Sequence, residues 1–184
     1  MRTAHALVED GEACKGAGGA GLRAAVLDAL AAGATRAGLR AAVHTQLVQD
    51  LHYREHLAEW AADVAARASD GGVPELADAL VAAVAADEGA AKGAAAFVAR
   101  LSRAAPRDAL RNAALVAERL LDADAPAVRM AAVEFFGALA VHAHGAEGGR
   151  AQADAMLDVV VERLRDASAF VRVRALHALS DAVS

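Results

Sequence analysis

Two stretches near the end of the chain carry one pattern: Leu121-Asp122-Ala123-Asp124-Ala125-Pro126-Ala127-Val128-Arg129 and Leu164-Arg165-Asp166-Ala167-Ser168-Ala169-Phe170-Val171-Arg172. The leucine, the valine and the arginine of the first stretch recur in the second at a constant offset of 43 positions. The offset continues from Ala132 to Ala175, within the helix that we expect after each stretch. The pattern therefore predicts a turn followed by a helix, used twice.

The length of this repeat indicates a class of fold. Helix pairs that recur every 40–47 residues or so are typical of HEAT and armadillo proteins, whose successive pairs stack into an α-solenoid. We predict an all-α, HEAT-type α-solenoid of stacked antiparallel helix pairs, clearest at residues 107–143 and 150–183. Such a stack presents an extended surface, and its usual role is to bind other macromolecules.

The composition favours helices throughout. Hydrophobic residues make up 57% of the 184 residues but aromatic residues only 3%, because alanine supplies most of the apolar content. Alanine is the best helix former and buries little area, so we expect helices packed closely over a thin core. Residues 1–20 are rich in glycine and alanine and are predicted to form a disordered tail, and residues 21–184 to form the helical repeat domain.

The charge and the cysteine content narrow the class of protein. The net charge is −5, and the acidic excess lies in the first half of the chain. The chain lacks the strongly basic composition that would indicate a nucleic-acid-binding domain. Cys14 is the only cysteine, which excludes an internal disulfide and fits a reducing compartment. No apolar run reaches the ~18 residues of a membrane span, so we expect a soluble, intracellular protein without membrane contact.

Four segments resemble, in the same order, the N-terminal region of condensin complex subunit 1, the D-type HEAT subunit of condensin. The first is Leu51-His52-Tyr53-Arg54-Glu55-His56-Leu57, and the second runs from Asp87 to Pro106. The third and fourth are the two repeat stretches, the fourth extended to Glu162. The family-like positions are His52, Tyr53, Glu55, His56, Arg129, Asp166 and Arg172.

The resemblance implies a non-catalytic protein of the nucleus and chromosome that acts in mitotic chromosome condensation. In that family the subunit associates with the kleisin and SMC subunits, and HEAT surfaces also contact DNA. It implies no cofactor. Members of the family are longer, so we expect this chain to correspond to part of such a protein. The alternative is a generic HEAT-repeat adaptor, of the phosphatase-scaffold or transport-receptor type.

The segment around His52 also has an enzymatic interpretation. His52, Glu55 and His56 fit H-x-x-E-H, the inverted zinc-protease motif, and Glu134 could serve as a third ligand of a metal-dependent hydrolase. We favour a structural role, because Tyr53 and Leu57 share the same helical spacing and the resemblance needs no metal.

The arginines of the repeats allow three interpretations. Arg129 and Arg172 lie near aspartates of the turns, which predicts an aspartate–arginine ladder between successive repeats. In the second interpretation, four arginines form a patch that contacts phosphate or a partner: Arg163, Arg165, Arg172 and Arg174. In the third, the arginines form a solvated charged face.

The last helix carries apolar residues that no following helix in this sequence would cover. Leu176, Leu179 and Val183 fall on one side of that helix. Since a solenoid repeat cannot bury its apolar face alone, we expect exposed apolar surface at this end. As a consequence, we expect the chain to be weakly stable or to self-associate through this surface.

Overall fold

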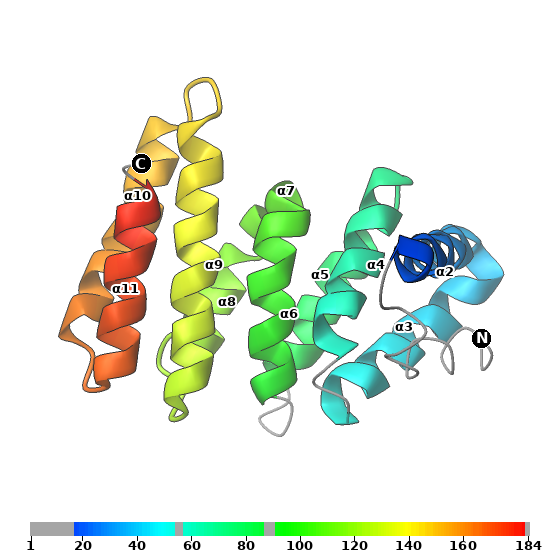
Figure 1. The fold of residues 1–184 in the computed structure, drawn as a ribbon, viewed down its shortest axis with the longest axis horizontal. Coiled ribbons are helices and arrows are strands. Elements are labelled where there is room, and N and C mark those ends of the chain that lie inside the picture. The colour runs from blue at the N-terminus through cyan, green and yellow to red at the C-terminus, as the bar shows by residue number, and fades with distance from the viewer. Residues whose placement is uncertain (1–16, 54–56, 87–90, 183–184) are drawn as a thin grey trace.

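The computed structural model describes residues 17–53, 57–86 and 91–182 (Figure 1). Within these ranges every regular element is a helix, so the predicted all-α class is confirmed. The elements are α2 (Ala17–Thr35), α3 (Ala37–Tyr53), α4 (Ala58–Asp70), α5 (Glu75–Ala86), α6 (Ala91–Ala104), α7 (Pro106–Arg111), α8 (Ala113–Leu120), α9 (Pro126–His144), α10 (Arg150–Glu162), the 3-10 helix η3 (Arg163–Arg165) and α11 (Ala169–Ala182).

The helices are arranged in two layers. Helices α2, α4, α6, α9 and α11 lie side by side in one row, and each packs against the next (Figure 1). Helices α3, α5, α8 and α10 lie behind this row, and α10 packs against α9. Neighbours in the front row are therefore alternate helices of the sequence over most of its length.

Prolines and glycines set several of the helix ends. Pro106 and Pro126 stand in the first turns of α7 and α9, where the fixed φ of proline suits the helix. Gly72, after α4, and Gly148, after α9, have φ values of 86° and 72°, a left-handed conformation that residues with a Cβ rarely adopt.

The N-terminal boundary differs from the sequence prediction. Helix α2 begins at Ala17, inside the stretch of residues 1–20 that we expected to be a disordered tail; residues 1–16 lie outside the described ranges. The alanines of α2 favour a helix strongly enough to tolerate its glycines, each of which costs about 1 kcal/mol relative to alanine.

The core follows the repeat predicted from the sequence. Val128 in α9 and Val171 in α11 hold equivalent positions, and both are fully buried. Phe135 and Phe136 pack edge to face at the centre of α9, with ring centroids 5.2 Å apart. A Cβ on Gly137 would lie only 2.8 Å from the Cβ of Ala178, so a missing side chain lets α9 and α11 approach closely.

Candidate functional site

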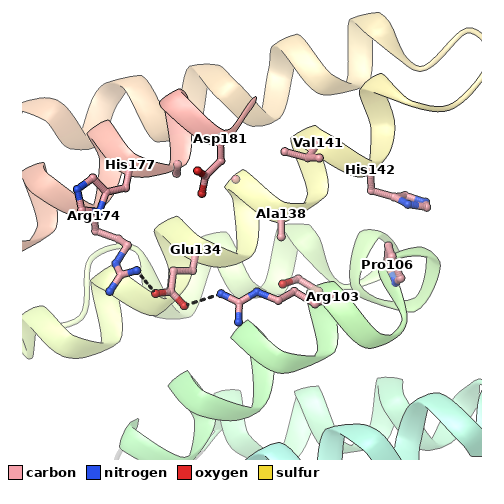
Figure 2. Close-up of a pocket in the computed structure, with 12 residues that line it drawn as sticks. Arg103, Pro106, Glu134, Ala138, Val141, His142, Arg174, His177 and Asp181 are labelled. Atoms are coloured by element: carbon pink, nitrogen blue, oxygen red, sulfur yellow. Dashed lines mark hydrogen bonds and ion pairs between the residues drawn. The ribbon is translucent and has the colours of Figure 1, made fainter. Parts of the chain in front are cut away.

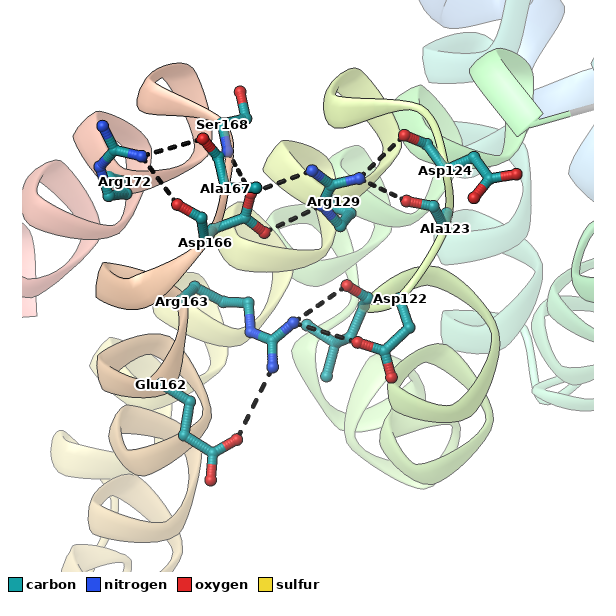
Figure 3. Close-up of polar contacts among 11 residues, drawn as sticks. Asp122, Ala123, Asp124, Arg129, Glu162, Arg163, Asp166, Ala167, Ser168 and Arg172 are labelled. Carbon is teal, nitrogen blue, oxygen red and sulfur yellow. Dashed lines mark hydrogen bonds and ion pairs between the residues drawn. The ribbon is translucent and has the colours of Figure 1, made fainter.

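Arg129 in the first turn of α9 connects two successive helix pairs (Figure 3). Its Nη1 donates to the backbone oxygens of Ala123 and Asp124, at 2.6 and 2.9 Å, which fixes the loop before its own helix. Its Nε and Nη2 donate to the two carboxylate oxygens of Asp166, both at 2.9 Å. Asp166 belongs to the loop before α11, so one guanidinium holds both loops, as the predicted ladder requires.

Asp166 is enclosed at this junction. Its side chain is 5% exposed and that of Arg129 is 14% exposed. The backbone N–H of Ser168 also donates to Asp166 Oδ1, at 2.8 Å. The hydrogen bonds from Arg129 lower the pKa of Asp166 below its ordinary value; burial opposes this shift and the Ser168 N–H adds to it.

Arg172 repeats the local half of this arrangement in α11. Its Nη1 donates to the backbone oxygens of Asp166 and Ala167, at 2.8 and 3.1 Å. These acceptors lie six and five residues before Arg172, as Ala123 and Asp124 do before Arg129. The sequence repeat is thus also a repeat of side-chain geometry.

The structure does not bring the four arginines of the expected phosphate-facing patch to one point. Arg163 donates from Nη1 to the backbone oxygen of Leu121 and to Asp122 Oδ1, both at 3.2 Å. Arg174 instead reaches across to Glu134 in α9, and Arg165 is exposed. Together with Arg172, three of the four are therefore held by other parts of this chain.

A groove lies on the front row between α6, α9 and α11 (Figure 2). It has a volume of about 400 Å³. Its apolar lining includes Gly137, Ala138, Val141 and Ala178. Its polar lining includes Ser102, Arg103, Glu134, His142, Arg174, His177 and Asp181.

Glu134 is the central charge of the groove. Its Oε1 pairs with Arg174 Nη1 at 2.6 Å, and its Oε2 accepts from Arg103 Nη2 at 3.2 Å (Figure 2). The carboxylate that we considered as a third zinc ligand is thus held by two arginines. Sequence reasoning missed the groove, because its residues come from four helices, α6, α7, α9 and α11, without a common local motif.

The same kind of contact joins every neighbouring pair of the front row. The ion pairs are Asp28–Arg67 (α2 to α4, 2.9 Å), Asp63–Arg100 (α4 to α6, 2.7 Å), Arg103–Glu134 (α6 to α9, 3.2 Å) and Arg174–Glu134 (α9 to α11, 2.6 Å). Ion pairs with exposed partners contribute little free energy, typically below ~1 kcal/mol. Their effect here is to fix how adjacent helices lie against each other.

The structure does not describe the side chains of the candidate zinc motif. His52 and Tyr53 fall in the last turn of α3 without described side chains, and Glu55 and His56 lie outside the described residues. Within the described ranges, no group of three histidine, cysteine, aspartate or glutamate residues could hold a metal ion.

No protein-family model matches the chain, and no curated protein matches it in sequence. None of the helices in the described part has the length and apolar character that crossing a membrane requires.

Proposed function

We propose that this chain is a HEAT-type α-solenoid scaffold that binds another protein, and that it is not an enzyme. One observation carries the proposal: Arg129 and Arg172 make the same contacts to the loops before their helices, and Arg129 also binds the loop of the next helix pair. Helix pairs with the same local geometry, held together by a contact between their loops, are what a solenoid needs, because each repeat gains most of its stability from its neighbours.

The groove between α6, α9 and α11 is the surface that best fits a bound segment of a partner. Gly137, Ala138 and Ala178 form a narrow floor without bulky side chains, and Val141 is half-exposed beside them. Charged groups surround this apolar strip, and an apolar centre with a polar rim is the usual build of a protein interface.

Photo-crosslinking tests the scaffold proposal. A benzophenone side chain placed at Ala138, in the groove, should capture a protein from the native extract, and the same group at the exposed Glu118 in α8 should not. Equal capture at both positions, or none at Ala138, would contradict binding in the groove.

A narrower proposal rests on the four sequence segments that resemble condensin subunit 1. In that case the chain serves in mitotic chromosome condensation in the nucleus, with the kleisin and SMC subunits as partners and DNA as a further contact. A purified kleisin fragment should then bind the full chain, Val141→Glu should weaken binding and Leu39→Glu, an equally exposed residue of α3, should not. If no binding occurs at ~100 μM, the condensin proposal fails, and a generic HEAT adaptor becomes the better interpretation.

A further inference from the structure

Helix α11 exposes large apolar residues at the end of the front row. Val173 and Leu176 are 50% and 55% exposed, and Phe170 is more exposed still. Val173 and Leu176 are one turn apart and so lie on one side of the helix. The opposite side, with Val171, Ala175 and Ala178, is buried.

On α9, which packs against α11, the position equivalent to Leu176 is buried, and Met130, equivalent to Val173, is partly buried. At the offset of 43 positions, Leu176 corresponds to Val133, which is 1% exposed. One turn beyond Val133 is Gly137, which faces Ala178 of α11 directly. The molecule therefore shows how a helix packs at the equivalent place on α9, with Ala178 against Gly137; on α11 the position of Gly137 is held by Ser180.

The polar half of the junction is repeated in the same way. Arg129 uses Nη1 for its own loop and directs Nε and Nη2 to Asp166. Arg172 uses Nη1 for its own loop, and within the described residues its Nε and Nη2 make no hydrogen bond. Figure 3 shows Arg172 at the outer end of the series, beyond Asp166. Its free edge has the geometry that binds a carboxylate in a bidentate manner.

We propose that Arg172, Val173 and Leu176 form a docking surface for a helix of a partner protein, preceded by an aspartate, that binds as Asp166 and α11 bind α9. The aspartate would take both free nitrogens of Arg172, and alanine-like residues of the partner helix would pack on Val173 and Leu176. The proposal rests on the repeat arrangement proposed above, and it adds the surface and the chemistry of the partner.

The chain itself supplies a suitable probe. A synthetic peptide of residues 163–182 contains the aspartate and the helix that already pack on α9. Titrated into the full chain, followed by isothermal calorimetry, it should bind with one site per chain. Leu176→Glu in the protein should weaken binding at least ~10-fold, because it places a charge in the apolar contact. The matched control Leu39→Glu, at a residue 44% exposed on α3, should leave the affinity unchanged.

A change in the peptide tests the polar contact separately. Asp166→Asn in the peptide keeps its size but removes the charge, and should weaken binding about 10-fold, as expected for losing a charge-assisted hydrogen bond. Arg172→Gln in the protein should abolish this difference between the two peptides, while Arg165→Gln, at an exposed neighbouring arginine, should preserve it.

Three results would overturn the proposal. The peptide could fail to bind at ~1 mM. It could also bind the Leu176→Glu variant and the original chain with equal affinity, which is the result expected if the peptide displaces α11 from α9. Light scattering could instead show a dimer that Leu176→Glu dissociates, which would make a second copy the occupant. The repeat arrangement is tested independently by the coupling of Arg129 and Asp166 within the chain, so the two failures are distinguishable.

Discussion

Replacing Asp166 by asparagine should destabilise the protein far more than the same change at Asp122. Asp166 accepts two hydrogen bonds from Arg129 and one from the Ser168 N–H, and its side chain is 5% exposed. Asp122 also pairs with an arginine, Arg163, but its side chain is 87% exposed. The two changes remove the same charge from two environments.

The expected loss at Asp166 is about 3 kcal/mol. Removing one partner of a buried ion pair costs roughly 3–5 kcal/mol, because the remaining charge is left without compensation. We place the value at the lower end because Arg129 keeps its two backbone acceptors and asparagine can still accept from Ser168. Asp122→Asn should cost no more than about 0.5 kcal/mol.

The pH dependence should follow from the lowered pKa of Asp166. In the unfolded chain the pKa of an aspartate is about 3.9. In the folded protein the pKa of Asp166 lies below that value. A group of this kind stabilises the fold fully above the unfolded pKa, and the contribution is lost as the pH falls through the folded pKa. The stability difference between the original chain and Asp166→Asn should therefore be complete at neutral pH and shrink below about pH 4.

Urea unfolding followed by circular dichroism measures these differences. A double-mutant cycle of Asp166→Asn with Arg129→Gln should give a coupling energy of about 2 kcal/mol. If the two changes are additive, or if Asp166→Asn costs no more than Asp122→Asn, then the contact between the helix pairs does not hold them together. The repeat interpretation would then lose its main physical support.

Two further substitutions test the packing. Gly137→Ala would place a Cβ 2.8 Å from that of Ala178, so overpacking of roughly 1–3 kcal/mol should outweigh the gain of about 1 kcal/mol in helix propensity. Thermal unfolding should show a lower midpoint that Ala178→Gly partly restores, and a raised midpoint in the single variant would contradict the close approach. Asn112→Ala removes hydrogen bonds from Nδ2 to Asp78 Oδ1 and the Asp108 backbone oxygen, at 2.7 and 2.9 Å, and should cost about 1–2 kcal/mol in urea unfolding. A cost below about 0.5 kcal/mol would show that these bonds do not hold α5 to the turn between α7 and α8.

The last two helix pairs could be predicted because their signals are local. Leucine, valine and arginine at fixed spacing define a turn and the first turn of the helix that follows, and α9 and α11 begin between the leucine and the valine of each copy. The break between α7 and α8 has no such signal, since the residue at the break is Asn112 and not a glycine or a proline. Asn112 at this break instead contacts Asp78, which lies 34 residues away in the sequence, and no local pattern records that contact.

The same distinction applies to the candidate sites. Arg129 is a repeated position and Asp166 lies in the second copy of the turn, and the sequence predicted aspartate–arginine contacts between the repeats. The pairing of Glu134 with Arg103 and Arg174 depends on how three helices lie against each other, and no pattern within one helix records it. Arg174 resembles the neighbouring arginines in sequence, yet on the helix it lies two residues from Arg172 and so points to a different side.

The contacts of Arg129 make the junction between helix pairs directional. Arg129 binds its own loop through Nη1 and the next loop through Nε and Nη2, which donate to Asp166. Ala123 stands where the next loop has Asp166, so the two loops differ at this position. The described contact therefore runs in one direction, from Arg129 to the loop that Arg172 in turn holds. The Arg172 guanidinium binds two backbone oxygens through Nη1, so only its Nε and Nη2 edge can bind a carboxylate of a partner. The proposed docking surface should therefore select a partner by the position of one carboxylate as well as by apolar area.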